Sequence, residues 1–148
     1  MSDMQAGPRS DAQQALLRSE RVVEQDHVEI RRMLERLRTS TDMRELTDVL
    51  GQLVEALALH FLKEEQPQGF FESLAGCLPE RRDEIAGLQQ EHARIKEALG
   101  RLCRTVAQPG MNHVAVHAAS AGLLQALAEH ERREHELAHA ASAGDGNA

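Results

Sequence analysis

The sequence has very little aromatic content: among its 148 residues there is no tryptophan, no tyrosine and only three phenylalanines. This excludes a surface that binds single-stranded nucleic acid by stacking bases on aromatic rings. Basic residues are also in the minority, with 17 Lys and Arg against 24 Asp and Glu and a net charge of −7. We therefore expect no nucleic-acid partner, because affinity for a phosphate backbone depends on clustered positive charge.

Cysteines and long apolar runs are scarce as well. Two cysteines are too few for a disulfide framework and fit a reducing compartment. No apolar run approaches the roughly 20 residues needed to span a bilayer. Residues 1–14 contain no apolar segment typical of a signal peptide. We therefore expect a cytoplasmic protein with no membrane partner, and its length suits a single domain.

What the sequence does contain is a helical pattern, in four segments at about residues 16–37, 46–64, 85–102 and 116–137. Each segment repeats apolar residues at alternating spacings of three and four, as along the packed seam of a helix. No segment shows the two-residue alternation of a half-buried strand. The pattern predicts an all-α fold, an up-down-up-down four-helix bundle over residues 13–139 joined by short turns. Residues 1–12 and 140–148 are predicted to be disordered tails.

Polar side chains occupy several seam positions where leucine or isoleucine is expected. There is one histidine in each predicted helix, and there are two glutamates: His27, His60, His92, His130, Glu64 and Glu134. Each glutamate follows a histidine by four residues, which places the two side chains on one face of the helix, one turn apart. The core of the bundle is therefore predicted to hold four imidazoles and two carboxylates.

Such groups cannot be buried without compensation, because each uncompensated ion costs several kcal/mol. A hydrogen-bonded His–Glu network without metal is one solution, but one histidine per helix with two matched carboxylates favours metal binding. Six ligands are too many for one tetrahedral zinc, and an imidazole-rich set disfavours magnesium and calcium. Two iron ions, bridged by the glutamates and by an oxo or hydroxo group, use the whole set. Manganese and zinc stay open as occupants of the same cage.

A ferritin-like centre is an alternative, because that architecture uses Glu-x-x-His on two helices. The sequence contains Glu24-x-x-His27 and Glu136-x-x-His139. Glu136, however, lies about 120° around the helix from the seam that contains His130. The ferritin-like interpretation is therefore the weaker one.

The ordered set of histidines and glutamates, spanning about residues 15–138, resembles the hemerythrin-like, or HHE cation-binding, family. The resemblance implies a hemerythrin-like four-helix bundle around a non-haem di-iron centre. It also implies roles for the six residues: His27 and His60 as terminal ligands of one iron, His92 and His130 of the other, and Glu64 and Glu134 as bridges.

Two positions depart from the oxygen-carrying members of that family. They have a second histidine four residues after the one on the third helix, where this chain has Lys96, and they end on an aspartate five residues after the last histidine, where this chain has Glu134 at four. The second iron would then have one ligand fewer and a more open coordination sphere. We therefore expect a protein that binds or reacts with O2, NO or peroxide in redox or iron sensing or stress protection, with oxidoreductase-like chemistry. The alternatives are an iron donor or repair factor for iron–sulfur proteins, and a metal-free helical interaction module.

Overall fold

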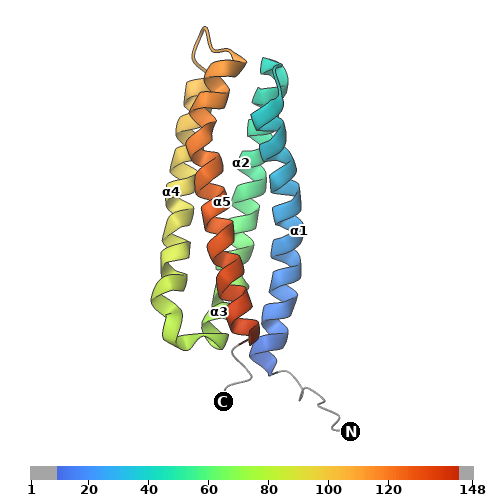
Figure 1. The fold of residues 1–148 in the computed structure, drawn as a ribbon, viewed down its shortest axis with the longest axis vertical. Coiled ribbons are helices and arrows are strands. Elements are labelled where there is room, and N and C mark those ends of the chain that lie inside the picture. Colours follow the sequence, from blue (N-terminus) through green and yellow to red (C-terminus); the bar gives the residue numbers. More distant parts are fainter. Residues whose placement is uncertain (1–9, 144–148) are drawn as a thin grey trace.

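The computed structural model describes residues 10–143, in which four long helices make up most of the chain. Helices α1 (Asp11–Thr39) and α4 (Arg82–Val106) run in one direction, and α2 (Met43–Glu65) and α5 (His113–Ala143) run in the other (Figure 1). The described residues contain no β-strand. The predicted all-α, up-down-up-down bundle is confirmed.

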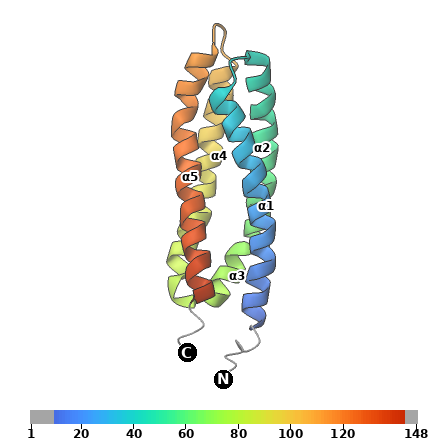
Figure 2. The same cartoon turned by 45° about the vertical axis from the view of Figure 1, so that its right-hand side comes forward.

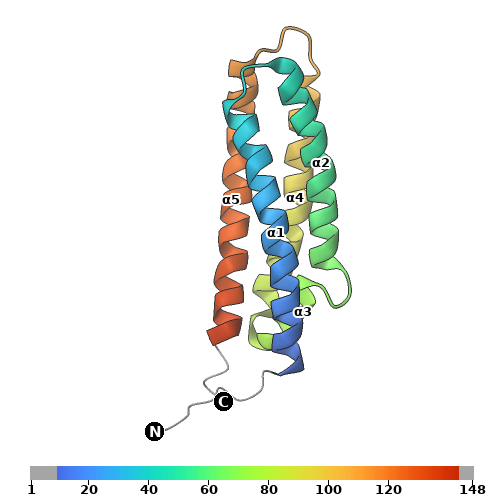
Figure 3. The same ribbon diagram turned by 90° about the vertical axis from the view of Figure 1, so that its right-hand side faces the viewer.

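The four long helices form a ring in which each packs against two neighbours. Helix α1 contacts α2 and α5, and α4 contacts the same two helices from the other side (Figures 2 and 3). The connection between α2 and α4 is more than the predicted turn. It contains a short helix, α3 (Phe70–Cys77), and a 3₁₀ turn, η1 (Pro79–Arg81), and α3 packs against all four long helices at one end of the bundle. Within residues 10–143, none of the helices combines the length and the hydrophobicity that a membrane-spanning segment needs.

The outer helices extend further than the sequence pattern indicated. The Ser10 hydroxyl accepts a hydrogen bond from the Gln13 backbone N–H, and the Gln13 side chain accepts one from the Ser10 N–H, so a capping box starts α1 at Asp11. Helix α5 continues to Ala143 because Ala138 and Ala141 pack into the core. Residues 11, 12 and 140–143 are thus helical rather than part of disordered tails. The rest of both predicted tails lies outside the described residues.

The apolar core is divided into two clusters by a polar layer. One cluster fills the end near the α1–α2 turn and includes Leu37, Leu46 and Val116. The other fills the end closed by α3 and includes Leu16 and Phe70. On α1, α4 and α5 the seam histidine falls between residues of the two clusters, and on α2 His60 lies at the end of the first cluster, which reaches Phe61. The fold therefore places the polar side chains in the interior, shielded at both ends.

The turn after α2 depends on a glycine. A Cβ atom on Gly69 would lie 2.4 Å from the carbonyl oxygen of Lys63 and 2.8 Å from that of Gln66. Both are backbone atoms, so neither can move aside without shifting the end of α2. Because Glu64 lies on that same last turn, Gly69 also fixes where the polar layer sits.

We predict that Gly69→Ala lowers the free energy of unfolding by about 1–3 kcal/mol, as overpacking against rigid atoms does. The matched control is Gly87→Ala within α4, where an added Cβ meets nothing within 4 Å. The control should be neutral or stabilising, because alanine is favoured over glycine in a helix interior. Urea unfolding of both variants measures the difference, and equal stability of the two would contradict this account of the turn.

Candidate metal centre

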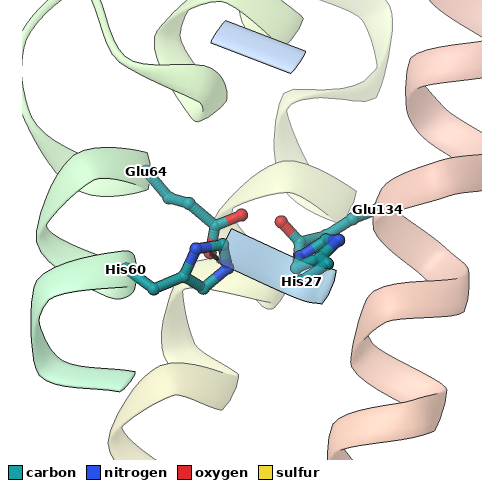
Figure 4. A group of neighbouring side chains, drawn as sticks. All are labelled: His27, His60, Glu64 and Glu134. Carbon is teal, nitrogen blue, oxygen red and sulfur yellow. Dashed lines mark ion pairs between the residues drawn. The ribbon is translucent and has the colours of Figure 1, made fainter. Parts of the chain in front are cut away.

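The six polar side chains predicted from the seams converge in one layer inside the bundle. They come from all four long helices: His27 from α1, His60 and Glu64 from α2, His92 from α4, and His130 and Glu134 from α5. All six are buried, with exposed fractions of 5% or less. Figure 4 shows Glu64 and Glu134 extending toward each other from α2 and α5, with the rings of His60 and His27 beside them.

Each glutamate lies between imidazoles of two different helices. Glu64 Oε1 is 3.4 Å from Nε2 of His60 on its own helix and 3.1 Å from Nε2 of His92 on α4. Glu134 Oε1 is 3.1 Å from Nε2 of His130 on its own helix and 3.9 Å from Nε2 of His27 on α1. All four Nε2 atoms therefore point inward, toward the carboxylates.

The inward-facing atoms have the properties of metal ligands rather than of a hydrogen-bonded core. All four carboxylate oxygens of Glu64 and Glu134 are buried without a hydrogen-bond partner, a costly state for a carboxylate. The Nε2 atoms of His92 and His130 lie 3.1 Å apart, a separation that suits one hydrogen bond between the rings in the metal-free chain and also a shared metal ion. Two ligands bound at about 2.1 Å to one ion at right angles lie about 3 Å apart. The donor set therefore fits metal cations.

Acidic residues outside the layer form hydrogen bonds with Nδ1, the outward-facing ring nitrogen, of two of the histidines. Asp26 Oδ2 lies 3.1 Å from His60 Nδ1, and Lys63 Nζ reaches both oxygens of Asp26, at 3.1 and 3.2 Å. Glu91 Oε2 lies 2.7 Å from Nδ1 of His130, and Arg133 pairs with the same carboxylate. A carboxylate on Nδ1 fixes the ring orientation and leaves Nε2 free to bind a metal.

The remaining two histidines also face carboxylates through Nδ1, at longer range. His92 Nδ1 lies 3.4 Å from Glu65 Oε1. His27 Nδ1 lies 3.6 Å from Glu24 and 3.5 Å from Glu131, and neither contact has hydrogen-bond geometry. An acidic group therefore neighbours every one of the four rings on the side away from the centre.

Burial keeps the histidines in the neutral form that a metal requires. It lowers the pKa of His27 to about 3 and that of His92 to about 2, with neighbouring histidines acting in the same direction. The pKa values of His60 and His130 are also lowered, mainly by burial, although their hydrogen-bonded carboxylates oppose the shift. Burial raises the pKa of Glu134, with Glu24 adding to the shift. A bound cation would favour the ionised carboxylate instead.

Aromatic rings seal the side of the centre at α4. Phe61 stacks on the His92 ring with centroids 3.8 Å apart, and Phe71 lies 5.1 Å from the same ring. Lys96, which follows His92 by one helical turn, is exposed and has its Nζ 5.9 Å from the centroid of Phe61. The lysine thus lies outside the layer, with an aromatic ring beside it.

The centre has an approximate two-fold relation between the α1–α2 and α4–α5 hairpins. In the first hairpin, Asp26 precedes His27 and pairs with His60 and Lys63. In the second, Glu91 precedes His92 and pairs with His130 and Arg133. Each glutamate of the layer follows the corresponding basic residue directly. The sequence shows no convincing overall repeat, so this short pattern is visible only once the contacts are known.

On the α1–α5 side the centre adjoins a hollow of about 500 Å³. Its inner end is formed by His27 and Glu134, and its outer part by Glu20, Glu24 and His135. Apolar residues, including Val23 and Phe70, line the remainder. The hollow therefore connects the surface between two helices with a carboxylate of the buried layer.

Sequence reasoning found the six inward-facing residues but not their outer partners. Asp26 and Glu91 are the missed residues, Glu65 and Glu131 were expected to be solvated charges, and Glu24 was considered only as a ferritin-like ligand. The signal for the two missed residues is an acidic residue directly before the first histidine of each hairpin. Glu136, the other ferritin-like candidate, is exposed and pairs with Arg132 on the surface, so a ferritin-like ligand set is not assembled.

Comparison with known proteins agrees with this geometry. The sequence model of the family described as the hemerythrin HHE cation binding domain matches residues 19–141 of the chain. Because the match covers most of the chain, the protein belongs to the hemerythrin HHE cation-binding family, as the ordered histidines and glutamates indicated. Domains of this family bind metal cations, and the buried His and Glu groups described above could hold them. The chain matched no curated protein and no solved structure.

The lowered histidine pKa values predict that the metal-free protein loses stability as the pH falls. Below about pH 6.5, histidines of the unfolded chain take up protons, whereas the buried rings do not until far lower pH. Each such histidine lowers the free energy of unfolding by up to about 1.4 kcal/mol for every pH unit by which the pH falls. Glu134 has a raised pKa and therefore favours the folded state as the pH falls. This is one group against four histidines whose effect has the opposite sign.

We expect the free energy of unfolding of the metal-free chain to fall by at least about 1 kcal/mol between pH 7 and pH 5.5. Urea titrations at several pH values measure it. His27→Gln should weaken the pH dependence, and His139→Gln, which changes an exposed side chain, should not. Stability that stays constant or rises toward pH 5.5 would show that the core histidines are not held neutral.

Proposed function

We propose that the six core side chains hold two iron ions, and that the protein binds or reacts with O2, NO or peroxide in redox or iron sensing or stress protection. The proposal rests mainly on one observation. Two fully buried carboxylates, Glu64 and Glu134, have no hydrogen-bond donor, yet each lies between imidazole nitrogens of two helices. A metal-free interaction module would gain nothing from this costly arrangement.

The grouping of ligand atoms supports two ions rather than one. Atoms of His27, His60, Glu64 and Glu134 all lie within 4.8 Å of one another. Atoms of Glu64, His92 and His130 form a second such group. In this proposal His27 and His60 would hold one ion and His92 and His130 the other. Glu64 belongs to both groups, and Glu134 also reaches His130, as expected of bridging carboxylates.

Bound iron would supply electrons and coordination positions for a small ligand. The chain's own residues supply the rest. Glu64 and Glu134 offset part of the positive charge, and Asp26 and Glu91 keep the rings of His60 and His130 in place. The two apolar clusters exclude water from both ends of the layer, which strengthens every electrostatic interaction inside it.

The position of Lys96 supports reactivity or sensing over oxygen carriage. An oxygen carrier has a further histidine at this place, whereas the exposed Lys96 side chain contributes no nitrogen ligand to the layer. The His92–His130 half would therefore have fewer protein ligands and a coordination position left for an added molecule. An open position suits a site that binds and transforms a ligand.

Replacing a bridging carboxylate should remove the metal. We expect Glu134→Gln to lose most of the bound iron, because a neutral amide replaces a charged bridge, and to lower the melting temperature of the iron-loaded protein. A ligand present at a hundred times its Kd stabilises a fold by about 2.7 kcal/mol. Metal analysis and thermal unfolding measure both effects.

The matched control for this experiment is Glu136→Gln, two residues further along α5 on the exposed surface. It should keep both the iron and the melting temperature of the unmodified chain. If Glu134→Gln retained two iron ions per chain, the proposed ligand assignment would be wrong. If the unmodified chain bound no iron, a metal-free helical module would be the better description.

Spectroscopy separates the proposed reactivity from iron donation. We expect the iron-loaded chain to show ligand-to-iron charge-transfer absorption that changes when O2, NO or hydrogen peroxide is added. We also expect the iron to stay with the chain through gel filtration in the presence of an apo iron–sulfur protein. Iron that moved quantitatively to the acceptor, with no spectral response to the three small molecules, would favour the donor role instead.

A further inference from the structure

The approximate two-fold symmetry of the centre does not extend to the residues around the outer faces of His27 and His92, which differ between the two hairpins. At His92 packed apolar side chains cover most of the ring, although Glu65 Oε1 lies 3.4 Å from its Nδ1. Phe61, which directly follows His60, stacks on the ring, and Ile85, seven residues before His92, is 5% exposed. No cation could approach the centre from this side without displacing packed side chains.

The equivalent positions around His27 are acidic. The residue directly after His130 is Glu131, and the residue seven before His27 is Glu20. Glu24 adds a third carboxylate, one turn before His27. The hollow of about 500 Å³ opens on this side and not on the sealed side. Among the described residues, three carboxylates therefore gather at the approach past His27, whereas His92 faces the carboxylate of Glu65.

Two outer side chains, Glu24 and His135, are close enough to bind one cation together with the buried His27. His135 Nε2 lies 2.9 Å from Glu24 Oε1 and 3.9 Å from Glu131 Oε1. The ligand atoms of Glu24, His135 and His27 lie within 4.8 Å of one another. Imidazole and carboxylate are ligands that suit divalent first-row metals.

A buried, unpartnered nitrogen also faces this group. His27 is 5% exposed, and its Nδ1 is buried without a hydrogen bond. The nitrogen points at Glu24 and Glu131, at 3.6 and 3.5 Å. The carboxylates that hydrogen-bond to the rings of His60 and His130 are each paired with a lysine or an arginine. Here the facing groups are Glu24, Glu131 and His135, and of the two carboxylates Glu131 is paired with Arg31.

We infer that Glu24 and His135, with the carboxylate of Glu131 beside them, form a loading site for a divalent iron ion on its way to the buried centre. The ion would be captured at the mouth of the hollow and would then pass the His27 ring to reach Glu134, which forms the inner end of the same hollow. A cleft lined by charge of one sign concentrates ions of the opposite sign and speeds their association. This inference rests on the proposed iron centre and adds the route by which the centre is filled.

One cation competes for this site. Arg31 Nη1 lies 3.6 Å from Glu131 Oε1. The Arg31 side chain is 52% exposed, so it can turn into solvent when an iron ion binds. Arg31 therefore neutralises the site without blocking it.

The experiment measures how fast the metal-free full chain takes up Fe²⁺ without oxygen, by quenching samples with a chelator and counting protein-bound iron. Glu24→Gln combined with His135→Gln should slow uptake at least about tenfold. The final iron content should equal that of the unmodified chain, because none of the six core ligands is changed. The matched control is Glu136→Gln combined with His139→Gln, which alters one exposed glutamate and one exposed histidine of α5, and it should load at the unmodified rate.

The outcomes separate this inference from the proposed function. Uptake by the Glu24/His135 variant at the unmodified rate would overturn the loading site alone, as would equal slowing in the control. Slow uptake with a lower final iron content would also overturn it, because these residues would then belong to the buried centre itself. An unmodified chain that takes up no iron would overturn the proposed function.

Discussion

Two carboxylates buried without hydrogen-bond donors are the constraint on which the rest of this structure depends. Glu64 and Glu134 are at most 1% exposed, and none of their oxygens accepts a hydrogen bond. Such groups are strongly destabilising unless something positive lies beside them. Four neutral imidazoles cannot provide that charge, but they are good partners for a cation that does. The apolar clusters at either end, the turn at Gly69 and the outward-facing carboxylates all serve to keep this layer in place.

The charges around the centre are arranged in alternating shells. Carboxylates lie innermost, imidazoles surround them, and a second set of acidic groups faces the outer nitrogens of the rings. Lys63 and Arg133 then balance Asp26 and Glu91. This order lets the interior hold positive ions while each ring keeps a fixed orientation. On the His27 side the basic residue is Arg31, which pairs with Glu131.

The parts of this structure that could be predicted from sequence are those that depend on helical periodicity. A histidine in place of leucine in a three–four seam must point into the bundle, so His27, His60, His92 and His130 were identifiable without coordinates. Their outer partners were not, because Asp26 contacts a histidine of α2 rather than its neighbour on α1. Such contacts depend on the rotation of one helix against another, which spacing along a single helix does not encode. Helix α3 was missed for a related reason: its eight residues are too few to show a periodic pattern, and packing against four helices stabilises it.

The contacts that the two glutamates make between the α1–α2 and α4–α5 hairpins also bear on how the two hairpins can move relative to each other. Glu64 reaches from the first hairpin to His92 of the second, and Glu134 reaches back to His27. Ions bound at these residues would cross-link the two hairpins near mid-height, in addition to the side-chain packing and the ion pairs, such as Arg31–Glu131, that already join them. Occupancy would then set how freely one hairpin can slide along the other. Metal occupancy of the interior would in this way change how the two hairpins move relative to each other at the outer surface of the molecule.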